Sequence, residues 1–154
     1  MLPILIMFAA ETLARPPITG FITGYQVARN GSSIQEQVPA GENVEQWTRM
    51  ITTQRFAGVA TRTNADGFLQ LMLDGLSAAC PGARTTYRRP VGRAAQMRID
   101  CPLNPKTGLP ETFFAKAIPG SADMHVAQVA FRRVPTAKDV SWAESYLAGV
   151  MVKP

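Results

Sequence analysis

The stretch that decides the fold is Phe21-Ile-Thr-Gly-Tyr-Gln-Val-Ala-Arg-Asn-Gly-Ser-Ser-Ile-Gln-Glu-Gln-Val38. Its first half alternates, which predicts a strand with Phe21, Tyr25 and Val27 on one side. Asn30-Gly31 follows, and this dipeptide is typical of a tight turn because both residues tolerate a positive φ. The residues after the turn alternate again. The sequence therefore predicts a β-hairpin at the start of the fold.

A helix is predicted directly after this hairpin. Asn43 is a suitable N-cap, and Gln46 three residues later completes a capping-box pattern. Gly58 is a suitable stop. The apolar residues between them recur at helical spacing and predict one buried stripe: Val44, Trp47 and Ile51.

Two more helices follow from similar signals. One starts near Asp66, carries a broad apolar face and ends at Pro81-Gly82, which places Cys80 at its C-terminal end. The other opens with a capping box formed by Thr136 and Asp139.

Between these helices the sequence predicts two further hairpins. Residues 85–89 and 94–101 flank a Pro-Val-Gly turn, and residues 113–118 and 125–133 flank a second turn. In the strand 94–101, Cys101 shares the core-facing side with Ala95, Met97 and Ile99. The order is ββ-α-α-ββ-ββ-α. Strands joined by hairpins form antiparallel sheets, so the predicted class is α+β with helices flanking the sheet.

The start of the chain resembles an export signal. Apolar residues 2–10 precede a small-residue site at Thr12 and Ala14, which predicts a signal peptide over residues 1–14 and a single domain over residues 15–154. The alternative is an intracellular protein whose first segment is buried. The apolar run is too short for a membrane span, so no transmembrane anchor is expected.

Export bears directly on Cys80 and Cys101, the only cysteines in the chain. In an oxidising compartment such a pair is more often a disulfide than a catalytic or metal site. Closing a loop of about 20 residues would stabilise the fold by about 3 kcal/mol. With one histidine in the chain, zinc lacks ligands, and neither a metal nor a cofactor is predicted. Two buried thiols are the alternative.

The net charge of +5 favours an anionic partner, although it is also compatible with a role in solubility alone. Nucleic acid is not expected as a partner of an exported protein. Arginines alternating on an exposed strand can bind carboxylates or phosphates, and they also protect a sheet edge from aggregation. The predicted partner-binding residues lie on the second hairpin: Arg84, Tyr87, Arg88, Arg89, Arg93 and Arg98.

Other residues suggest catalysis less directly. His125, the single histidine, is either a hydrogen-bonded structural residue or a general base. Glu36, Glu42 and Glu45 could act on a glycan, but acidic residues near a helix N-terminus also have a structural explanation. The chain contains no Gly-x-Ser-x-Gly elbow and no phosphate-binding glycine loop, so no catalytic residue is assigned.

The block Val38-Pro-Ala-Gly-Glu-Asn-Val-Glu-Gln-Trp-Thr-Arg-Met-Ile-Thr-Thr-Gln-Arg-Phe56 resembles one in small, exported, functionally uncharacterised proteins of Gram-negative bacteria. Cys80-Pro-Gly, Cys101 and the segment from Gly120 to Arg132 fit the same resemblance. The order of elements is also similar to the PsbP-like architecture of photosystem accessory subunits and some envelope lipoproteins. This chain has no lipobox cysteine near its start, so a lipid anchor is not implied.

Three functions remain open from the sequence. The first is a periplasmic or secreted, non-enzymatic protein that binds a partner protein or an anionic envelope component through the arginine-rich strand. The second is a small cell-envelope hydrolase that uses His125 or a glutamate as its base. The third is an accessory subunit of a membrane complex. The sequence makes no prediction of oligomeric state.

Overall fold

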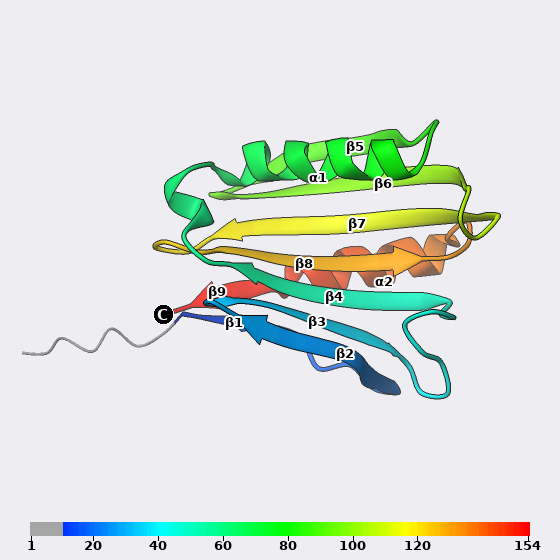
Figure 1. The fold of residues 1–154 in the computed structure, drawn as a ribbon, viewed down its shortest axis with the longest axis horizontal. Helices are drawn as coiled ribbons and strands as arrows, with labels where there is room; N and C mark the ends of the chain where they lie inside the picture. The colour runs from blue at the N-terminus through cyan, green and yellow to red at the C-terminus, as the bar shows by residue number, and fades with distance from the viewer. Residues whose placement is uncertain (1–10) are drawn as a thin grey trace, which may run out of the picture.

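The structure is a computed structural model and describes residues 11–154 of the chain. Its main feature is a seven-stranded antiparallel sheet in the order β2-β3-β4-β8-β7-β6-β5 (Figure 1). The strands of this sheet are β2 (Phe21–Arg29), β3 (Ser32–Pro39), β4 (Arg49–Phe56), β5 (Arg84–Val91), β6 (Ala94–Asn104), β7 (Leu109–Pro119) and β8 (Met124–Phe131). Two short strands, β1 (Thr12–Ala14) and β9 (Met151–Lys153), form a second sheet. The predicted α+β class with an antiparallel sheet is confirmed.

Two helices cover opposite faces of the large sheet (Figure 1). Helix α1 (Ala65–Ala79) packs on one face, where Phe68 and Leu69 contact Met97 and Val126. Helix α2 (Ala137–Ala148) packs on the other face, where its buried residues meet Phe114, Val129 and Phe131. We call these the α1 face and the α2 face. A short 3-10 helix, η1 (Val59–Thr61), joins β4 to α1.

The predicted helix after the first hairpin is wrong. Asn43 does cap locally, because its side chain accepts hydrogen bonds from the amides of Glu45 and Gln46, but the chain then enters β4. Met50 and Ile51 are consecutive and both buried, which is typical of a strand covered on both faces. The run Ile-Thr-Thr at residues 51–53 is β-branched, and pairing with β3 and β8 outweighs the helical spacing.

A bulge changes the predicted side assignment in β2. The register shifts between Thr23 and Tyr25, so Ile22, rather than Phe21, shares a face with Tyr25 and Val27. Phe21 instead contacts Trp142 of α2, with ring centroids 6.1 Å apart.

Other local signals produce the expected structure. Asn30 and Gly31 have φ of 52° and 78° and form the turn between β2 and β3. Thr136 and Asp139 form the predicted capping box of α2. Helix α1 begins at Ala65 with Asn64 as its cap, one residue before the predicted start.

The ends of the described chain pair with each other. Strand β1 runs antiparallel to β9, with Leu13 opposite Val152 (Figure 1). Residues 1–10 of the predicted signal peptide lie outside the described residues, whereas Glu11 and β1 pack on the domain. No helix within residues 11–154 has the length and apolar character needed to cross a membrane.

Candidate functional site

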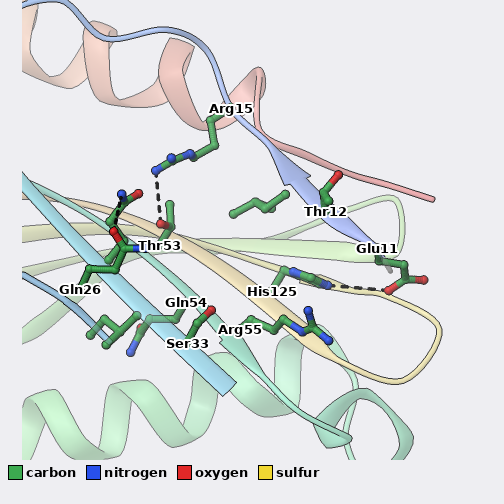
Figure 2. Close-up of a pocket in the computed structure, with 12 residues that line it drawn as sticks. Glu11, Thr12, Arg15, Gln26, Ser33, Thr53, Gln54, Arg55 and His125 are labelled. Carbon is green, nitrogen blue, oxygen red and sulfur yellow. Dashed lines mark hydrogen bonds and ion pairs between the residues drawn. The ribbon is translucent and has the colours of Figure 1, made fainter. Parts of the chain in front are cut away.

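A polar cleft lies on the α2 face, between β1 and the neighbouring strands β3 and β4 (Figure 2). Its volume is about 270 Å³. Amide, hydroxyl and charged side chains dominate its wall, which provides many hydrogen-bond donors and acceptors. The lining residues are Glu11, Thr12, Leu13, Arg15, Gln26, Ser33, Ile34, Gln35, Thr53, Gln54, Arg55 and His125.

His125 and Glu11 meet in this cleft (Figure 2). The His125 side chain is 2% exposed, and its Nε2 lies 3.7 Å from Oε2 of Glu11. No group in the described part of the chain makes a hydrogen bond with this buried nitrogen. His125 shares its face with Val129 and Phe131, as the alternation predicts.

The two groups influence each other's protonation. Burial lowers the pKa of His125, and the Glu11 carboxylate opposes part of this effect. A hydrogen bond of 2.8 Å from the amide of Ser121 lowers the pKa of Glu11, and His125 adds a smaller contribution. At neutral pH the site therefore holds an uncharged imidazole beside an ionised carboxylate, which is a pair able to accept a proton.

Gly120 leaves room for this carboxylate. An added Cβ at Gly120 would collide with Oε2 of Glu11, so the carboxylate can take this position only because residue 120 has no side chain. This close approach to Gly120 holds the Glu11 carboxylate against the turn that leads into β8. The position of Glu11 is thus defined by two neighbours, the missing side chain of Gly120 and the amide of Ser121.

Two arginines of the cleft, Arg55 and Arg15, are held in place by polar contacts. Nε of Arg55 pairs with Oδ2 of Asp123 at 2.7 Å, and Oδ1 of Asp123 accepts from the Gly58 amide at 2.8 Å. This amide and Arg55 hold the pKa of Asp123 below its ordinary value. Nη1 of Arg15 donates to the Gln37 and Thr53 side chains at 3.1 and 3.3 Å.

The residues predicted to bind a partner are divided between the two faces of the sheet. Arg88 lies on the α1 face, where its guanidinium forms a bidentate ion pair with Asp66 and a hydrogen bond with Gln70. Arg98 faces α2 by the regular alternation of β6, and Tyr87 and Arg89 face α2 because a bulge between Thr85 and Tyr87 shifts the register of β5.

On the α2 face, Arg98 and Tyr87 are engaged in internal contacts. Nη2 of Arg98 lies 2.9 Å from Oδ1 of Asp100. Tyr87 is half-buried, and burial together with the carboxylate of Glu144 raises its pKa to about 12.

Three arginines of the hairpin remain exposed. The guanidinium of Arg89 lies 4.6 Å from the centre of the Tyr87 ring, and one nitrogen donates to Gln96 at 3.4 Å. Arg84 is opposite Asp100 in the register, and Arg93 lies in the turn at the end of the hairpin. None of the three forms an ion pair with a carboxylate of residues 11–154.

Cys80 and Cys101 lie at disulfide distance. Their Cα atoms are 6.0 Å apart, within the range of disulfide-bonded pairs, and both residues are buried. The pair would fasten the C-terminal end of α1 to β6.

The predicted glutamate cluster is not assembled. Glu42 accepts from the amide and hydroxyl of Thr48 and so closes the loop before β4. Glu36 lies on β3, where burial raises its pKa. Within the described ranges, no group of three histidine, cysteine or acidic side chains is arranged to hold a metal ion.

Most of the cleft has no recognisable signal in the sequence. Glu11 and Arg15 flank the end of the predicted signal peptide, and Arg55 was placed in the predicted helix. Their partners are His125, Thr53 and Asp123, which lie far away in the sequence. Long-range pairing of this kind produces no local pattern, and only the isolated histidine hinted at the site.

Comparison with known proteins adds a fold but no family. No protein-family model matches the sequence, and no curated protein matches it significantly. A solved structure of a mutant of the protein Mog1 is similar, with a TM-score of 0.57 and 11% identity over 87% of this chain and 78% of that chain. At this identity the likeness shows the α+β fold alone.

Proposed function

We propose that this is an exported, non-enzymatic protein that binds an anionic component of the cell envelope, or an acidic partner protein, through Arg84, Arg89 and Arg93. The observation that carries the proposal is their exposure along one hairpin without carboxylate partners in the described chain. The net charge of +5 draws anionic ligands to the molecule. The buried cysteine pair at disulfide distance supports a periplasmic or secreted location.

Guanidinium groups suit this role because they offer several N–H donors to phosphate or carboxylate oxygens. Stacking on Tyr87 holds the Arg89 side chain in one orientation, which reduces the entropy lost on binding. Binding of this type weakens with salt, since the exposed charges are screened. Arg88 and Arg98 instead support the hairpin through Asp66 and Asp100.

The test compares two triple variants of equal charge. Wild-type protein is titrated with phosphatidylglycerol vesicles, with peptidoglycan fragments and with an acidic peptide, at low and high salt. Replacing Arg84, Arg89 and Arg93 with alanine is expected to weaken binding by about a hundredfold, since each cation near an anionic surface contributes about 1 kcal/mol. The control replaces Lys106, Lys138 and Lys153, which are exposed elsewhere.

The outcomes separate specific recognition from net charge. A much larger loss in the hairpin variant than in the control supports the proposal. Equal losses of affinity in both variants would show that binding depends on net charge alone. An absence of salt-sensitive binding would refute the proposal. Arg88→Ala is expected to leave the affinity unchanged, because this side chain is held by Asp66 and Gln70.

The contact between His125 and Glu11 favours a second candidate, a small hydrolase acting on envelope material. In this mechanism the neutral imidazole accepts a proton from water as the water oxygen bonds to the scissile carbon. The bond to the leaving group breaks, and the imidazolium returns the proton to that group. Glu11 would stabilise the imidazolium by its charge.

Cell-wall fragments are the test substrate for this candidate. Hydrolysis that is lost in both His125→Gln and Glu11→Gln, while Glu45→Gln remains active, would support it. Glu45 is a suitable control because it is an exposed acid outside the cleft. If the wild-type protein binds anionic ligands but hydrolyses no cell-wall fragment, the hydrolase candidate is refuted and only the binding function is retained.

A further inference from the structure

We propose that β2 pairs with β2 of a second copy, so that two molecules form an antiparallel dimer through this edge of the sheet. β2 is the last strand on one side of the seven-stranded sheet (Figure 1). No strand of residues 11–154 covers its outer edge. An edge of this kind presents N–H and C=O groups that another strand can bind.

The two edges of the sheet differ in how they are protected. β5 carries Arg84, Arg88, Arg89 and Pro90, and charged residues and proline both discourage edge-to-edge pairing. Residues 21–28 of β2 include no charged residue and no proline. Two copies of β5 would bring several arginines together, whereas β2 carries a single charged residue, Arg29, at its end.

The side chains of β2 are also unusually apolar for an exposed edge. Ile22, Tyr25 and Val27 are 46%, 47% and 44% exposed, and all three lie on the α1 face. Helix α1 contacts β6 and β7, so it covers the part of the α1 face that lies away from β2. A second copy beside β2 would continue the sheet and shield these side chains from water.

The hairpin turn determines which backbone groups point outward. A two-residue turn at Asn30-Gly31 makes Arg29 and Ser32 a hydrogen-bonded pair, so the groups of Arg29 and Val27 point toward β3. Those of Gln26 and Ala28 therefore point away from the sheet. The bulge near Gly24 ends this regular edge, which spans residues 25–29.

A two-fold axis at Val27 pairs the outward backbone groups of the two copies and also brings compatible side chains opposite each other. It sets Gln26 opposite Ala28 of the second copy, where both residues have outward N–H and C=O groups. Val27 then faces Val27 in a pair without hydrogen bonds, in which side chains approach most closely. Tyr25 faces Arg29 of the second copy, and this arrangement allows a cation–π contact.

This register favours a second copy over an unrelated strand. A symmetric dimer requires a surface complementary to itself, and here the aromatic residue and the cation of each copy exchange places. The contact is small, so the dimer is expected to depend on concentration. The arginine hairpin on β5 stays exposed at both ends of the joined sheets.

A cysteine crosslink tests the register directly. Val27→Cys places two thiols opposite each other across the axis, at a separation suited to a disulfide. In oxidised glutathione, this variant is expected to form a covalent dimer about tenfold faster than Val91→Cys, because only residue 27 is held against its own copy. Val91 is a matched control, since it is an exposed valine on the opposite edge strand.

Sedimentation velocity over a range of concentrations tests the dimer without crosslinking. Ala28→Pro removes an outward N–H group, which an edge strand tolerates, and should leave the protein folded and monomeric. Val27→Lys should weaken the dimer by about fivefold or more, because like charges would face each other. Val91→Lys should have no effect.

Two results would overturn the proposal. One is a wild-type monomer at every concentration, which would leave the edge to a strand from another protein. The other is equal crosslinking of Val27→Cys and Val91→Cys, which would show that residue 27 is not held against its own copy. Both measurements are independent of the anionic ligand proposed above.

Discussion

The carboxylate of Glu11 lies 3.7 Å from the imidazole Nε2 of His125, although Glu11 precedes β1 and His125 is the second residue of β8. The carboxylate raises the pKa of His125, while burial lowers it. Because His125 is the only histidine, its ring protons give a single titration curve in an NMR experiment. The contact between β1 and the sheet can therefore be measured in solution.

Glu11→Gln is expected to lower the pKa of His125 further, because the charge that stabilises the imidazolium is removed. Gly120→Ala should act in the same direction, since the new methyl group displaces the Glu11 carboxylate. Glu45→Gln, at an exposed site outside the cleft, should leave the titration unchanged. An unchanged pKa in both cleft variants would show that Glu11 does not contact His125 in solution.

Stability is expected to fall when the pH drops below the ordinary His pKa of 6.5. The pKa of His125 is depressed in the folded protein, so the unfolded chain takes up the proton first and gains stability. The loss continues until the pH reaches the folded-state pKa. Urea unfolding between about pH 8 and pH 5.5 would measure it, and His125→Gln should flatten the curve. A wild-type curve as flat as that of the variant would contradict the burial of a neutral His125.

Lys116→Met is expected to destabilise the fold by about 1–3 kcal/mol, because Nζ of Lys116 donates to the carbonyls of Leu147 and Val150 at 3.0 and 2.8 Å. These carbonyls lie at the C-terminal end of α2, where a cation is also favourable. Lys138→Met, on the exposed side of the same helix, should change stability by about 0.5 kcal/mol or less. Equal effects on urea unfolding would argue against the buried contact.

Replacing both Cys80 and Cys101 with alanine is expected to cost about 3 kcal/mol of stability, since the crosslink closes a loop of 21 residues. Unfolding of the wild-type protein with and without a reductant gives an independent measurement. Reduction should destabilise the wild type and leave the double variant unchanged. If the purified protein shows two titratable thiols without reduction, the disulfide and the argument for export both fail.

Local patterns in the sequence predicted much of the fold. The Asn30-Gly31 turn, the alternation from Ala95 to Cys101 and the Thr136 capping box each depend on neighbouring residues, and each produces the expected element. The helix expected around Trp47 does not form, because residues far away in the sequence determine the structure of this segment. Its cap forms, but contacts from distant strands decide the conformation of residues 49–56.

The candidate sites were harder to predict because they depend on register and on distant pairing. Arg88 and Arg89 point to opposite faces because they are consecutive on β5, but the bulge before Tyr87 decides which face each one takes, and no sequence pattern indicated that extra residue. Glu11 reaches His125 because β1 pairs with β9, which joins the two ends of the described chain. Strands of three residues carry too few side chains for a recognisable alternation.

The pairing of β1 with β9 also has a mechanical consequence. Thr12 lies opposite Lys153, so a load applied beyond these two residues pulls at the same end of both strands. Such a load peels the ladder apart one residue pair at a time, from Thr12 toward Ala14. Because β1 forms one wall of the polar cleft, traction on the chain would open the cleft before any strand of the large sheet separates.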